Sequence, residues 1–319
     1  MKKIITVLSC VLTLTLAASC DWFKLDNQEG WDASVEGQIL DAGTNQPIQF
    51  AQYTASSTNS DYLASRLTVV EKGWKAEENQ YWTIKTNGSY KNTLVFSGQY
   101  TMNTLSSNFT CDPQSFELKK GENKVDFKVT PYVRIENVTW AMEGKKIKVT
   151  CKVSSPVPSV NNLGEVRLCI AVDRFVSMSD NGAAKDPNSY VTDVDPSGTT
   201  VTLYIDPEYK DATGQLVNAA EFQYDQVHYV RVAAMGAHYT IVPEWTEENT
   251  EIDWDNFPWA LLASDWSNFN DIVVYKTTVI VHPASYSNDG SVNSGSAYNY
   301  SPVYKLDLKA GTFTEVTDW

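Results

Sequence analysis

Residues 80–105 read QYWTIKTNGSYKNTLVFSGQYTMNTL. Three runs with alternating apolar residues are separated by the pairs Asn87-Gly88 and Ser97-Gly98. A period of two indicates a half-buried strand, and such pairs between two runs indicate tight turns. The segment therefore predicts three consecutive strands. Its candidate core residues are Trp82, Ile84, Leu94, Phe96, Tyr100 and Met102.

Strand patterns also flank this segment on both sides. Upstream, SVEGQILD over residues 34–41 alternates apolar and small residues with polar ones. Downstream, NKVDFKV over residues 123–129 places Val125, Phe127 and Val129 on one face, and Pro131 follows. We therefore expect a first β-sandwich over residues 33–130.

The rest of the chain repeats this kind of pattern. Strands are expected in YVRIENVTWAMEGKKIKVTCKV, EVRLCIAVD, VTLYID, HYVRVAAM and YNYSPVYKLDL, the last of which closes the fold. Short strands separated by Gly, Asn and Pro turns are typical of a sandwich. We expect a second sandwich over residues 131–319, and the best helical pattern is confined to residues 256–265.

The N-terminus has the pattern of an export signal. Lys2 and Lys3 precede an apolar run, and small residues lead to Cys20. This order is typical of a cleaved signal peptide over residues 1–19. The residues before Cys20 resemble the bacterial lipobox, which implies that its thiol is acylated and that the protein is held on a membrane by lipid. Residues 20–32 would form a stalk.

Charge and cysteine content restrict the partners. The formal net charge is −14, which disfavours binding to nucleic acid because phosphates would be repelled. Cys111, Cys151 and Cys169 remain beside the lipidation site. Cys151 is expected to face the core and Cys169 to face away from it, so a disulfide between them is disfavoured.

The first sandwich resembles the carboxypeptidase-regulatory-like family, which has a transthyretin-like fold. The match is carried by Val35, Gly37, Ile39, Asp41, Thr44, Pro47, Ile48, Gly98 and Tyr100. The usual Thr-Gly pair of that family is Thr44-Asn45 here. The second half resembles immunoglobulin or fibronectin type III modules through HYVRVAAMGA and SPVYKLDL. We therefore expect an all-β protein of two consecutive sandwiches, with an insertion before the last strand of the second.

Several segments together are similar to two-domain lipoproteins of unknown function from gut Bacteroidetes. These segments are the lipobox, QYWTIKTNGSYKNT, VDFKVTPYVRIENV and YNYSPVYKLDL. The resemblance implies an outer-membrane lipoprotein that faces the cell exterior and is encoded near Sus-type polysaccharide-utilisation machinery. The resemblance supplies no catalytic motif. An outer-membrane transporter complex is a candidate partner.

The sequence offers little for catalysis or metal binding. His228 lies on the apolar face of its strand, and His238 and His282 have no partner at metal-ligand spacing. Carboxylates such as Asp253 and Asp255 would suit a glycosidase, but such pairs are common in an acidic chain. We expect neither an enzyme nor a cofactor.

Calcium stays as an alternative at two clusters of oxygen ligands. The first cluster is Asp193, Asp195 and Ser197, and the second is Asn288 with Asp289. Neither cluster fits an EF-hand loop. A hairpin turn explains the first and a flexible loop explains the second.

Tryptophan gathers in residues 239–275, part of an insertion expected at about 239–300. Sugar rings have an apolar face and a rim of hydroxyls, so aromatic side chains beside carboxylates and amides suit them. Such insertions also tend to carry function. The candidate glycan-binding residues are Trp245, Trp254, Trp259, Trp266, Asp253, Asp255, Asn256 and Tyr298.

Three functions are compatible with these sequence features. A surface protein that binds a polysaccharide or host glycan explains the anchor and the tryptophans. A structural or protein-interaction module, acting as a transporter partner or an adhesin, explains the anchor and the sandwiches alone. An enzyme is the weakest of the three. Buried tryptophans in the insertion would favour the second function.

Overall fold

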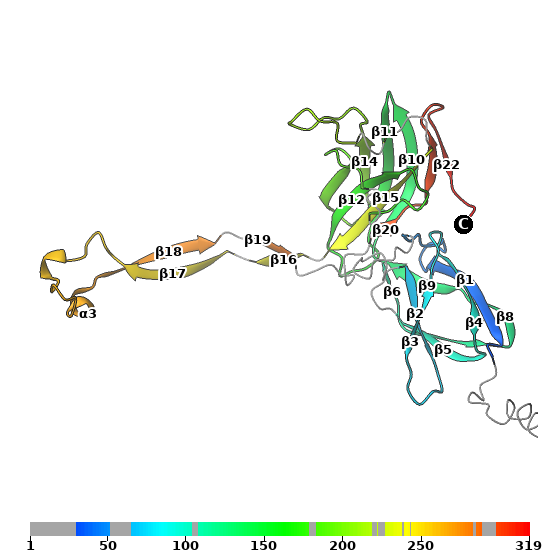
Figure 1. The fold of residues 1–319 in the computed structure, drawn as a ribbon, viewed down its shortest axis with the longest axis horizontal. Helices are drawn as coiled ribbons and strands as arrows, with labels where there is room; N and C mark the ends of the chain where they lie inside the picture. Colours follow the sequence, from blue (N-terminus) through cyan, green and yellow to red (C-terminus); the bar gives the residue numbers. More distant parts are fainter. Residues whose placement is uncertain are drawn as a thin grey trace, which may run out of the picture.

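The computed structural model of the chain is built almost entirely of β-strands (Figure 1). It describes residues 30–51, 65–103, 108–178, 183–218, 222, 227–237, 239–242, 244–282, 285–288 and 298–319, of which 239–242 and 285–288 are described as backbone only. Two separate cores lie in two consecutive sandwich-like domains. The predicted all-β class is confirmed. Cys20 lies outside the described residues.

The first sandwich packs two sheets face to face. One sheet has the order β4-β1-β9-β6, with β8 also paired to β1. Its strands are β1 (Ala33–Asp41), β4 (Ser89–Val95), β6 (Phe109–Thr110), β8 (Gly121–Lys124) and β9 (Phe127–Pro131). The other sheet has the order β3-β2-β5-β7. Its strands are β2 (Arg66–Glu71), β3 (Asn79–Thr83), β5 (Gly98–Asn103) and β7 (Gln114–Leu118).

The core of this sandwich follows the alternation in the sequence. Val35 and Ile39 of β1 are buried between the sheets with Trp82, Tyr100 and Met102. Between them in β1 stands Gly37, where an added Cβ would lie 1.7 Å from the carbonyl oxygen of Val125. The chain between β8 and β9 therefore crosses directly over Gly37, and only glycine allows this approach.

Leu94 corrects one prediction about this core. It is 57% exposed, whereas its neighbour Val95 is buried. The pairing of β1 with β4 shifts register, because Ala33 pairs with Val95 while Val35 pairs with Asn92. A bulge inserts an extra residue and reverses which side chains face inward beyond it. The sequence pattern does not reveal that shift.

The second sandwich also has two sheets. The smaller one has the order β10-β11-β14, with β10 (Arg134–Glu143), β11 (Lys146–Ser154) and β14 (Thr199–Ile205). The larger one has the order β13-β12-β15-β21-β22, with β20 paired to β15. Its strands are β12 (Asn162–Ala171), β13 (Tyr190–Val194), β15 (His228–Ala237), β20 (Asn299–Tyr300), β21 (Tyr304–Asp307) and β22 (Thr312–Glu315). The closing segment predicted as one strand thus forms β20 and β21, which pair with β15, and β22 completes the sheet edge.

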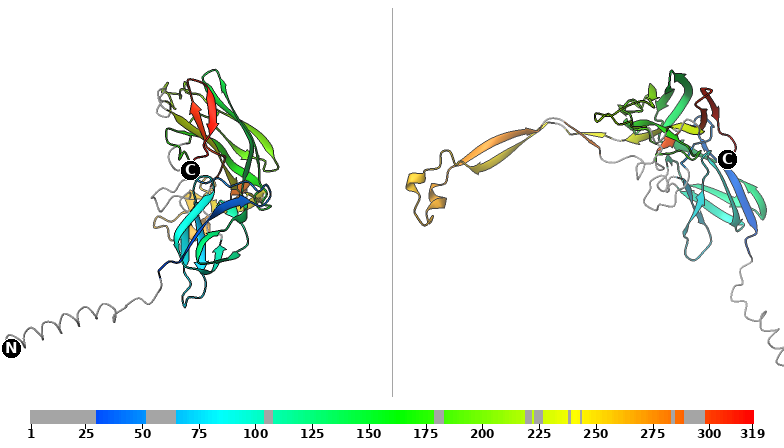
Figure 2. Two further views of the ribbon diagram at one scale, coloured as in Figure 1. Left: turned by 90° about the vertical axis from the view of Figure 1, so that its right-hand side faces the viewer. Right: turned by 45° about the horizontal axis from the view of Figure 1, so that its top comes forward.

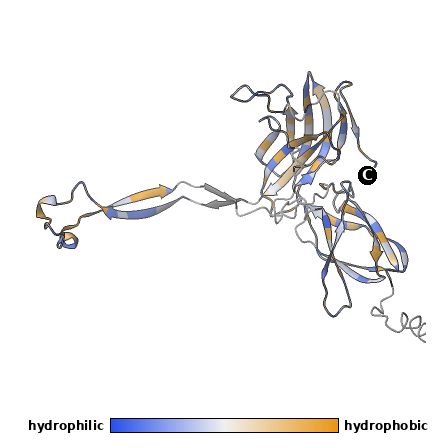
Figure 3. Cartoon of the chain, viewed as in Figure 1, coloured by the Kyte–Doolittle hydropathy of each residue, from blue (hydrophilic) through white to orange (hydrophobic). Residues whose placement is uncertain are grey.

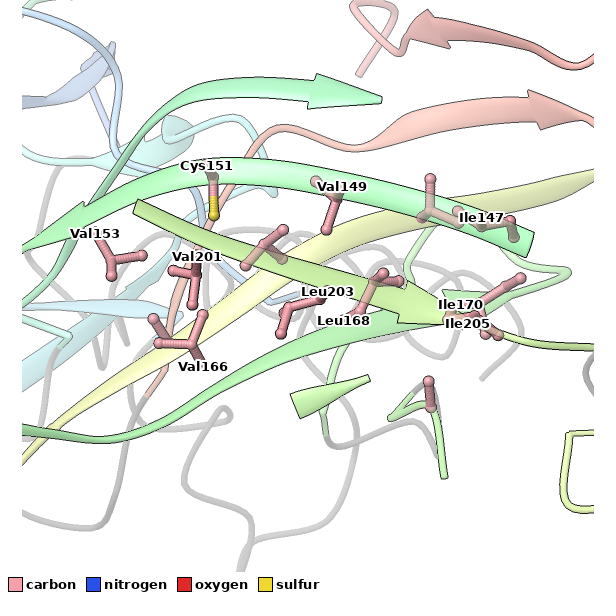
Figure 4. Packing of buried hydrophobic residues seen from close by; sticks show 14 of the residues in the cluster. Ile147, Val149, Cys151, Val153, Val166, Leu168, Ile170, Val201, Leu203 and Ile205 are labelled. Atoms are coloured by element: carbon pink, nitrogen blue, oxygen red, sulfur yellow. The ribbon is translucent and has the colours of Figure 1, made fainter. Parts of the chain in front are cut away.

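Alternate residues of β11 and β14 face β12 across the core of the second sandwich (Figure 4). Cys151 lies in this core, 1% exposed. Cys169 is buried in a different cluster with Tyr300 and Val303. The prediction that these two cysteines face different sides is confirmed, and neither forms a disulfide with a described residue. Trp140, by contrast, is only half-buried and stacks on Phe313.

Buried polar groups join the two sandwiches. The Asn299 side chain donates from Nδ2 to the carbonyl oxygen of Asn108 and accepts the Val133 N–H at Oδ1, at 2.9 Å in both cases. Arg231 is fully buried and donates to the carbonyl oxygens of Phe50 and Ser301. Breaking such buried bonds leaves polar groups unsatisfied, so they hold the two sandwiches together.

A two-stranded arm leaves the second sandwich after β15. It pairs β16 (Tyr239–Val242) with β19 (Ser285–Asn288), and β17 (Trp245–Ile252) with β18 (Tyr275–His282). Between β17 and β18 lie a short 3₁₀ turn, η1 (Trp259–Leu261), and one helical turn, α3 (Phe269–Ile272). A second direction of view shows the arm extending away from both sandwiches (Figure 2). None of the described helices could span a membrane.

Candidate functional site

The arm carries its tip far from both cores. β17 and β18 pair along their whole lengths, from Trp245 with His282 to Ile252 with Tyr275. Each strand has 8 residues. At a rise of about 3.3 Å per residue, this paired part alone is about 26 Å long. Among the described residues, the ring contacts and side-chain hydrogen bonds of residues 253–274, here called the arm tip, are made within that segment.

Phe257 forms the centre of a small aromatic cluster in the arm tip. It is 4% exposed, the most buried side chain of this segment. Its ring centroid lies 4.7 Å from that of Trp259, 5.5 Å from that of Trp254 and 5.4 Å from that of Phe269. Edge and offset contacts between rings at these distances are favourable. The cluster orders a segment that has little other apolar packing.

Three indoles of the cluster remain open to solvent, two of them in contact with Phe257 and the third in contact with Trp259 and Phe269. Trp254, Trp259 and Trp266, here called the tip tryptophans, are 48%, 55% and 53% exposed. The rings of Trp254 and Trp259 lie 5.9 Å apart at 22°, while Trp266 stands at 84° to Trp259. Each indole is thus held by ring contacts on one side and exposed on another.

Trp266 has an unusual backbone conformation. Its φ is +61°, in the left-handed region that bulky side chains rarely adopt. The Trp266 N–H donates to the carbonyl oxygen of Ala263, and the Phe269 N–H donates back to Trp266. Conformations of this kind persist only where surrounding contacts hold them, and they cluster at functional sites. The turn places the indole against Phe269, 5.7 Å away between ring centroids.

Polar groups beside the indoles are held in a tight turn. The Asp253 carboxylate accepts the Asn256 side-chain amide at 2.7 Å and the Asn256 N–H at 3.2 Å. The hydrogen bond from that amide lowers the pKa of Asp253 below its usual value. Asp255 is exposed in the same turn. The structure thus brings Asp253, Asp255 and Asn256 together with Trp254.

The charge of the arm tip has one sign. Residues 253–274 contain the carboxylates Asp253, Asp255, Asp265 and Asp271 and no Lys, Arg or His. The adjacent cation, Lys276, pairs with Glu251 at 3.4 Å. The tip therefore presents hydrogen-bond acceptors without an adjacent unpaired cation.

Trp245 and Tyr298 lie elsewhere. Trp245 is at the far end of β17 from the tip, where its ring stacks on His282 at 3.9 Å and 8°. Tyr298 lies in the second sandwich and donates its hydroxyl hydrogen to Glu165 at 2.7 Å. Neither residue joins the tip tryptophans. His228 is fully buried beside Phe222, in agreement with the prediction of a core histidine.

The candidate calcium ligands form an ordinary turn where they are described. Asp195 accepts the Ser197 N–H at 2.8 Å, and Asp193 accepts the Asn162 amide at 3.1 Å. Asp289 and His238 lie outside the described residues, and only the backbone of Asn288 is described. In the described ranges there is no group of three or more His, Cys, Asp and Glu side chains that could hold a metal ion.

Three members of the tip were not singled out from the sequence. Phe257 and Phe269 complete the aromatic cluster, and Leu261 is 65% exposed beside Trp259 in η1. The density of aromatic residues in this segment could have included both phenylalanines. Which aromatic ring is central and which are exposed depends on the turns, and no periodicity encodes those.

Comparison with known proteins places part of the chain in a known sequence class. Residues 33–130 match the model described as "Protein of unknown function (DUF3823) N-terminal domain". The resemblance of the same residues to the carboxypeptidase-regulatory-like family stays a prediction. No curated protein matches the chain.

Two solved structures match this chain, the first of them with a similar fold. One is a proposed carbohydrate binding protein from Bacteroides uniformis ATCC 8492, 22% identical, with a TM-score of 0.56 over 87% of this chain and 99% of that one. The other is a DUF3823 family protein from Parabacteroides merdae ATCC 43184, 16% identical, with a TM-score of 0.49 over 65% of this chain and 92% of that one. At these identities the likeness concerns the fold.

Proposed function

We propose that this protein is a lipid-anchored cell-surface protein that binds glycans through its arm tip and has no catalytic role. The observation that carries the proposal is the tip itself, in which the half-exposed Trp254 and Trp259 are held against the buried Phe257. The half-exposed Trp266 packs beside Trp259. The similar structure from Bacteroides uniformis is named as a proposed carbohydrate binding protein, which supports a role in glycan binding.

The chemistry of the tip suits a sugar ring. The apolar C–H face of a pyranose stacks on an exposed indole, and its hydroxyls donate to carboxylate and amide oxygens at the edge. Trp254 and Trp259 offer the faces, while Asp255 and Asn256 offer the edge. Because the indoles are already held by Phe257, little side-chain entropy is lost when a ligand binds.

The charge of the tip narrows the class of glycan. The carboxylates of residues 253–274 would repel uronic acid, sialic acid and sulfated units. Neutral hexoses, N-acetylhexosamines and free amino sugars would meet no such repulsion. The proposed ligand is therefore a neutral or amino-sugar-containing glycan.

The anchor is part of the proposal. Lipid on Cys20 would hold the mature chain at the outer membrane and leave the arm free to reach ligands at the cell exterior. Replacing Cys20 with Ala should release the protein into the soluble fraction, because no other apolar anchor is found in the sequence after the signal peptide. Labelling with a fatty-acid analogue should mark the wild type and leave Cys20→Ala unmarked.

A glycan array probed with the soluble chain starting at Asp21 tests the sugar site. Each of Trp254→Ala, Trp259→Ala and Trp266→Ala should weaken retention by about tenfold or less, because a ring contact contributes on the order of 1 kcal/mol. Trp245→Ala is the matched control, since Trp245 is equally exposed in the same arm but lies outside the tip. It should leave retention unchanged.

The alternative outcome is equally specific. If no glycan is retained, or if Trp245→Ala weakens retention as much as the three tip variants, the tip is not a sugar site. Retention of sulfated or uronic glycans above neutral ones would contradict the charge argument alone.

One observation favours a second function, that of a protein-interaction module. β18 forms an edge of the ribbon whose side chains Tyr275, Val279 and Val281 are 59%, 60% and 55% exposed. Figure 3 shows the apolar character of β18 beside the more polar β17. Exposed apolar edge strands accept further strands from partner proteins. Val279→Lys should then abolish binding to an outer-membrane transporter partner while leaving glycan retention intact.

A further inference from the structure

A hollow lies between the two sandwiches, far from the arm tip. Its volume is about 640 Å³, and its walls come from β1 and the loop after it, from the start of β10, and from the segments around β20 and the C-terminal end. Figure 1 shows the C-terminal end beside the first sandwich at this junction. Hollows of this size at domain interfaces are where proteins commonly bind small molecules.

A guanidinium with unused donors forms part of the wall. Arg134 donates from Nε to Asp41 Oδ2 at 2.6 Å and from Nη2 to Asp41 Oδ1 at 2.8 Å. An arginine side chain has five N–H donors, so this pair leaves three of them. Among the described residues Arg134 has no further hydrogen-bond partner, and its side chain is 23% exposed. These donors are available to a ligand in the hollow.

Gly43 makes this arrangement possible. A Cβ added to Gly43 would lie 2.2 Å from Arg134 Nη2, closer than any real contact. The Gly43 N–H also donates to Asp41 Oδ1 at 2.8 Å. The loop after β1 is therefore shaped to hold the carboxylate and the guanidinium in one fixed geometry.

A β-bulge forms another part of the wall. The pairing of β10 with β11 shifts register between Glu136 and Thr139. Asn137, inside this bulge, has a φ of +54°. Glu136 and Asn137 both line the hollow. Bulges and left-handed residues are frequent beside binding sites, where they redirect side chains.

The remaining wall supplies apolar faces and further polar groups. Tyr304 and Trp319 are half-buried and line the hollow together with the exposed Gln46. The positive charge of Arg134 is already compensated by Asp41, and Glu136 and Glu315 add uncompensated negative charge. An anionic ligand would therefore be repelled, whereas a neutral ligand with many hydroxyls would find both donors and acceptors.

We infer that this junction is a second binding site, for a neutral monosaccharide or a neutral sugar unit of a longer glycan. Sugar hydroxyls accept from the Arg134 N–H groups and the Asn137 amide and donate to Glu136. The ring packs against Tyr304 and Trp319. The site shares no residue with the arm tip, so either site can exist without the other.

Saturation-transfer NMR on the mature chain tests this inference. The probes are glucose, galactose, mannose and N-acetylglucosamine, with glucuronate as the anionic comparison. At least one neutral sugar should receive saturation from the wild type, and glucuronate should receive less. Because the arm tip is itself proposed to bind neutral sugars, the variants are made in a chain that already carries Trp254→Ala and Trp259→Ala. In that chain Gln46→Trp places an indole in the hollow from an exposed loop position and should abolish the remaining signal. Gln99→Trp, at an exposed position of β5, is the matched control and should keep it.

Two further variants separate this site from the arm tip and from misfolding. Trp254→Ala together with Trp259→Ala weakens the tip and should leave the part of the monosaccharide signal that comes from the hollow. Asn137→Gly retains the positive φ and removes only the amide, so it should reduce the signal without lowering the unfolding temperature.

The inference is overturned if no neutral sugar receives saturation, or if Gln46→Trp binds as well as Gln99→Trp. It is also overturned if the chain carrying Trp254→Ala and Trp259→Ala gives no signal before Gln46→Trp is introduced, because the sugar would then bind at the tip alone. If the tip variants lose glycan-array retention but keep a monosaccharide signal, the junction binds sugar independently of the tip.

Discussion

β11 in the second sandwich and β18 in the arm are both rich in β-branched residues but have very different surroundings. In β11 alternate residues such as Val149 and Val153 are fully buried, because β12 covers them from the opposite sheet. In β18 Val279 and Val281 are more than half exposed, because the ribbon has two strands and no covering sheet. An apolar strand pattern therefore specifies a strand, while a second layer decides whether that strand becomes core or surface.

The same contrast applies to the tryptophans. Trp82 is 4% exposed among Tyr90, Tyr100 and Phe116, whereas Trp259 is 55% exposed over Phe257. Sequence composition treats both as large aromatic residues. Their free-energy contributions to folding should differ severalfold, and this difference can be measured.

The largest effect is expected for Trp82→Ala. Removing a buried indole should lower the free energy of unfolding by about 3 to 5 kcal/mol, whereas Trp259→Ala should lower it by less than about 1 kcal/mol. Chemical denaturation followed by circular dichroism would measure both. If the two variants lose similar stability, the proposed difference between the buried core of the first sandwich and the arm tip is wrong.

An intermediate effect is expected for Asp41→Asn. Asp41 pairs with Arg134 across two elements, so removing its charge should lower the free energy of unfolding by about 1 to 3 kcal/mol. Asp253 pairs only with Asn256 in its own turn, so Asp253→Asn should cost less. Thermal unfolding of both variants at pH 7 would compare a carboxylate that pairs between distant strands with one that pairs within its own turn.

The Asp41 pair should also show a pH dependence. Burial would raise the pKa of Asp41, but hydrogen bonds from Arg134 and the Gly43 N–H, with the guanidinium charge, outweigh burial and lower that pKa. A lowered pKa contributes stability above the usual pKa of Asp, and this stability is lost as the pH falls through the lower folded value. The gap in the free energy of unfolding between wild type and Asp41→Asn should therefore narrow below about pH 4. A constant gap would contradict the ion pair.

The smallest effect is expected from removing the arm. Replacing residues 239–288 with a short Gly-Ser loop should change the unfolding temperature of the two sandwiches by less than about 4 °C, because the described side chains of residues 244–282 belong to neither core. Differential scanning calorimetry of the loop variant and the full chain would measure this. A large drop would show that the arm supports the second sandwich.

Several features of the fold could be read from local pattern. The alternation in β1, β11 and β14 predicted their buried faces, and Cys151 and Cys169 lie on different sides as expected. Leu94 shows the limit of this reasoning, because a register shift between β1 and β4 turned Val95 inward instead. Bulges depend on pairing between distant strands, so they cannot be predicted from the sequence of a single strand.

The candidate site was only partly accessible to such reasoning. The clustering of tryptophan and carboxylate residues pointed to the segment that forms the arm tip. It did not separate Trp245 and Tyr298, which lie elsewhere, from Trp254, Trp259 and Trp266. Residues that are close in sequence can lie far apart in an extended strand. Trp245 is at one end of the ribbon and the tip is at the other.

The sequence by itself determined the all-β class, the main strand faces and the segment in which tryptophan residues gather, because these depend on residue type and local period. Only the tertiary structure decided which indoles stay exposed. It also decided that Arg134, Asn137 and Tyr304 would share one hollow with Gln46. Those outcomes depend on which distant strands pair and where two sandwiches meet, and burial is a property of that packing rather than of any one strand.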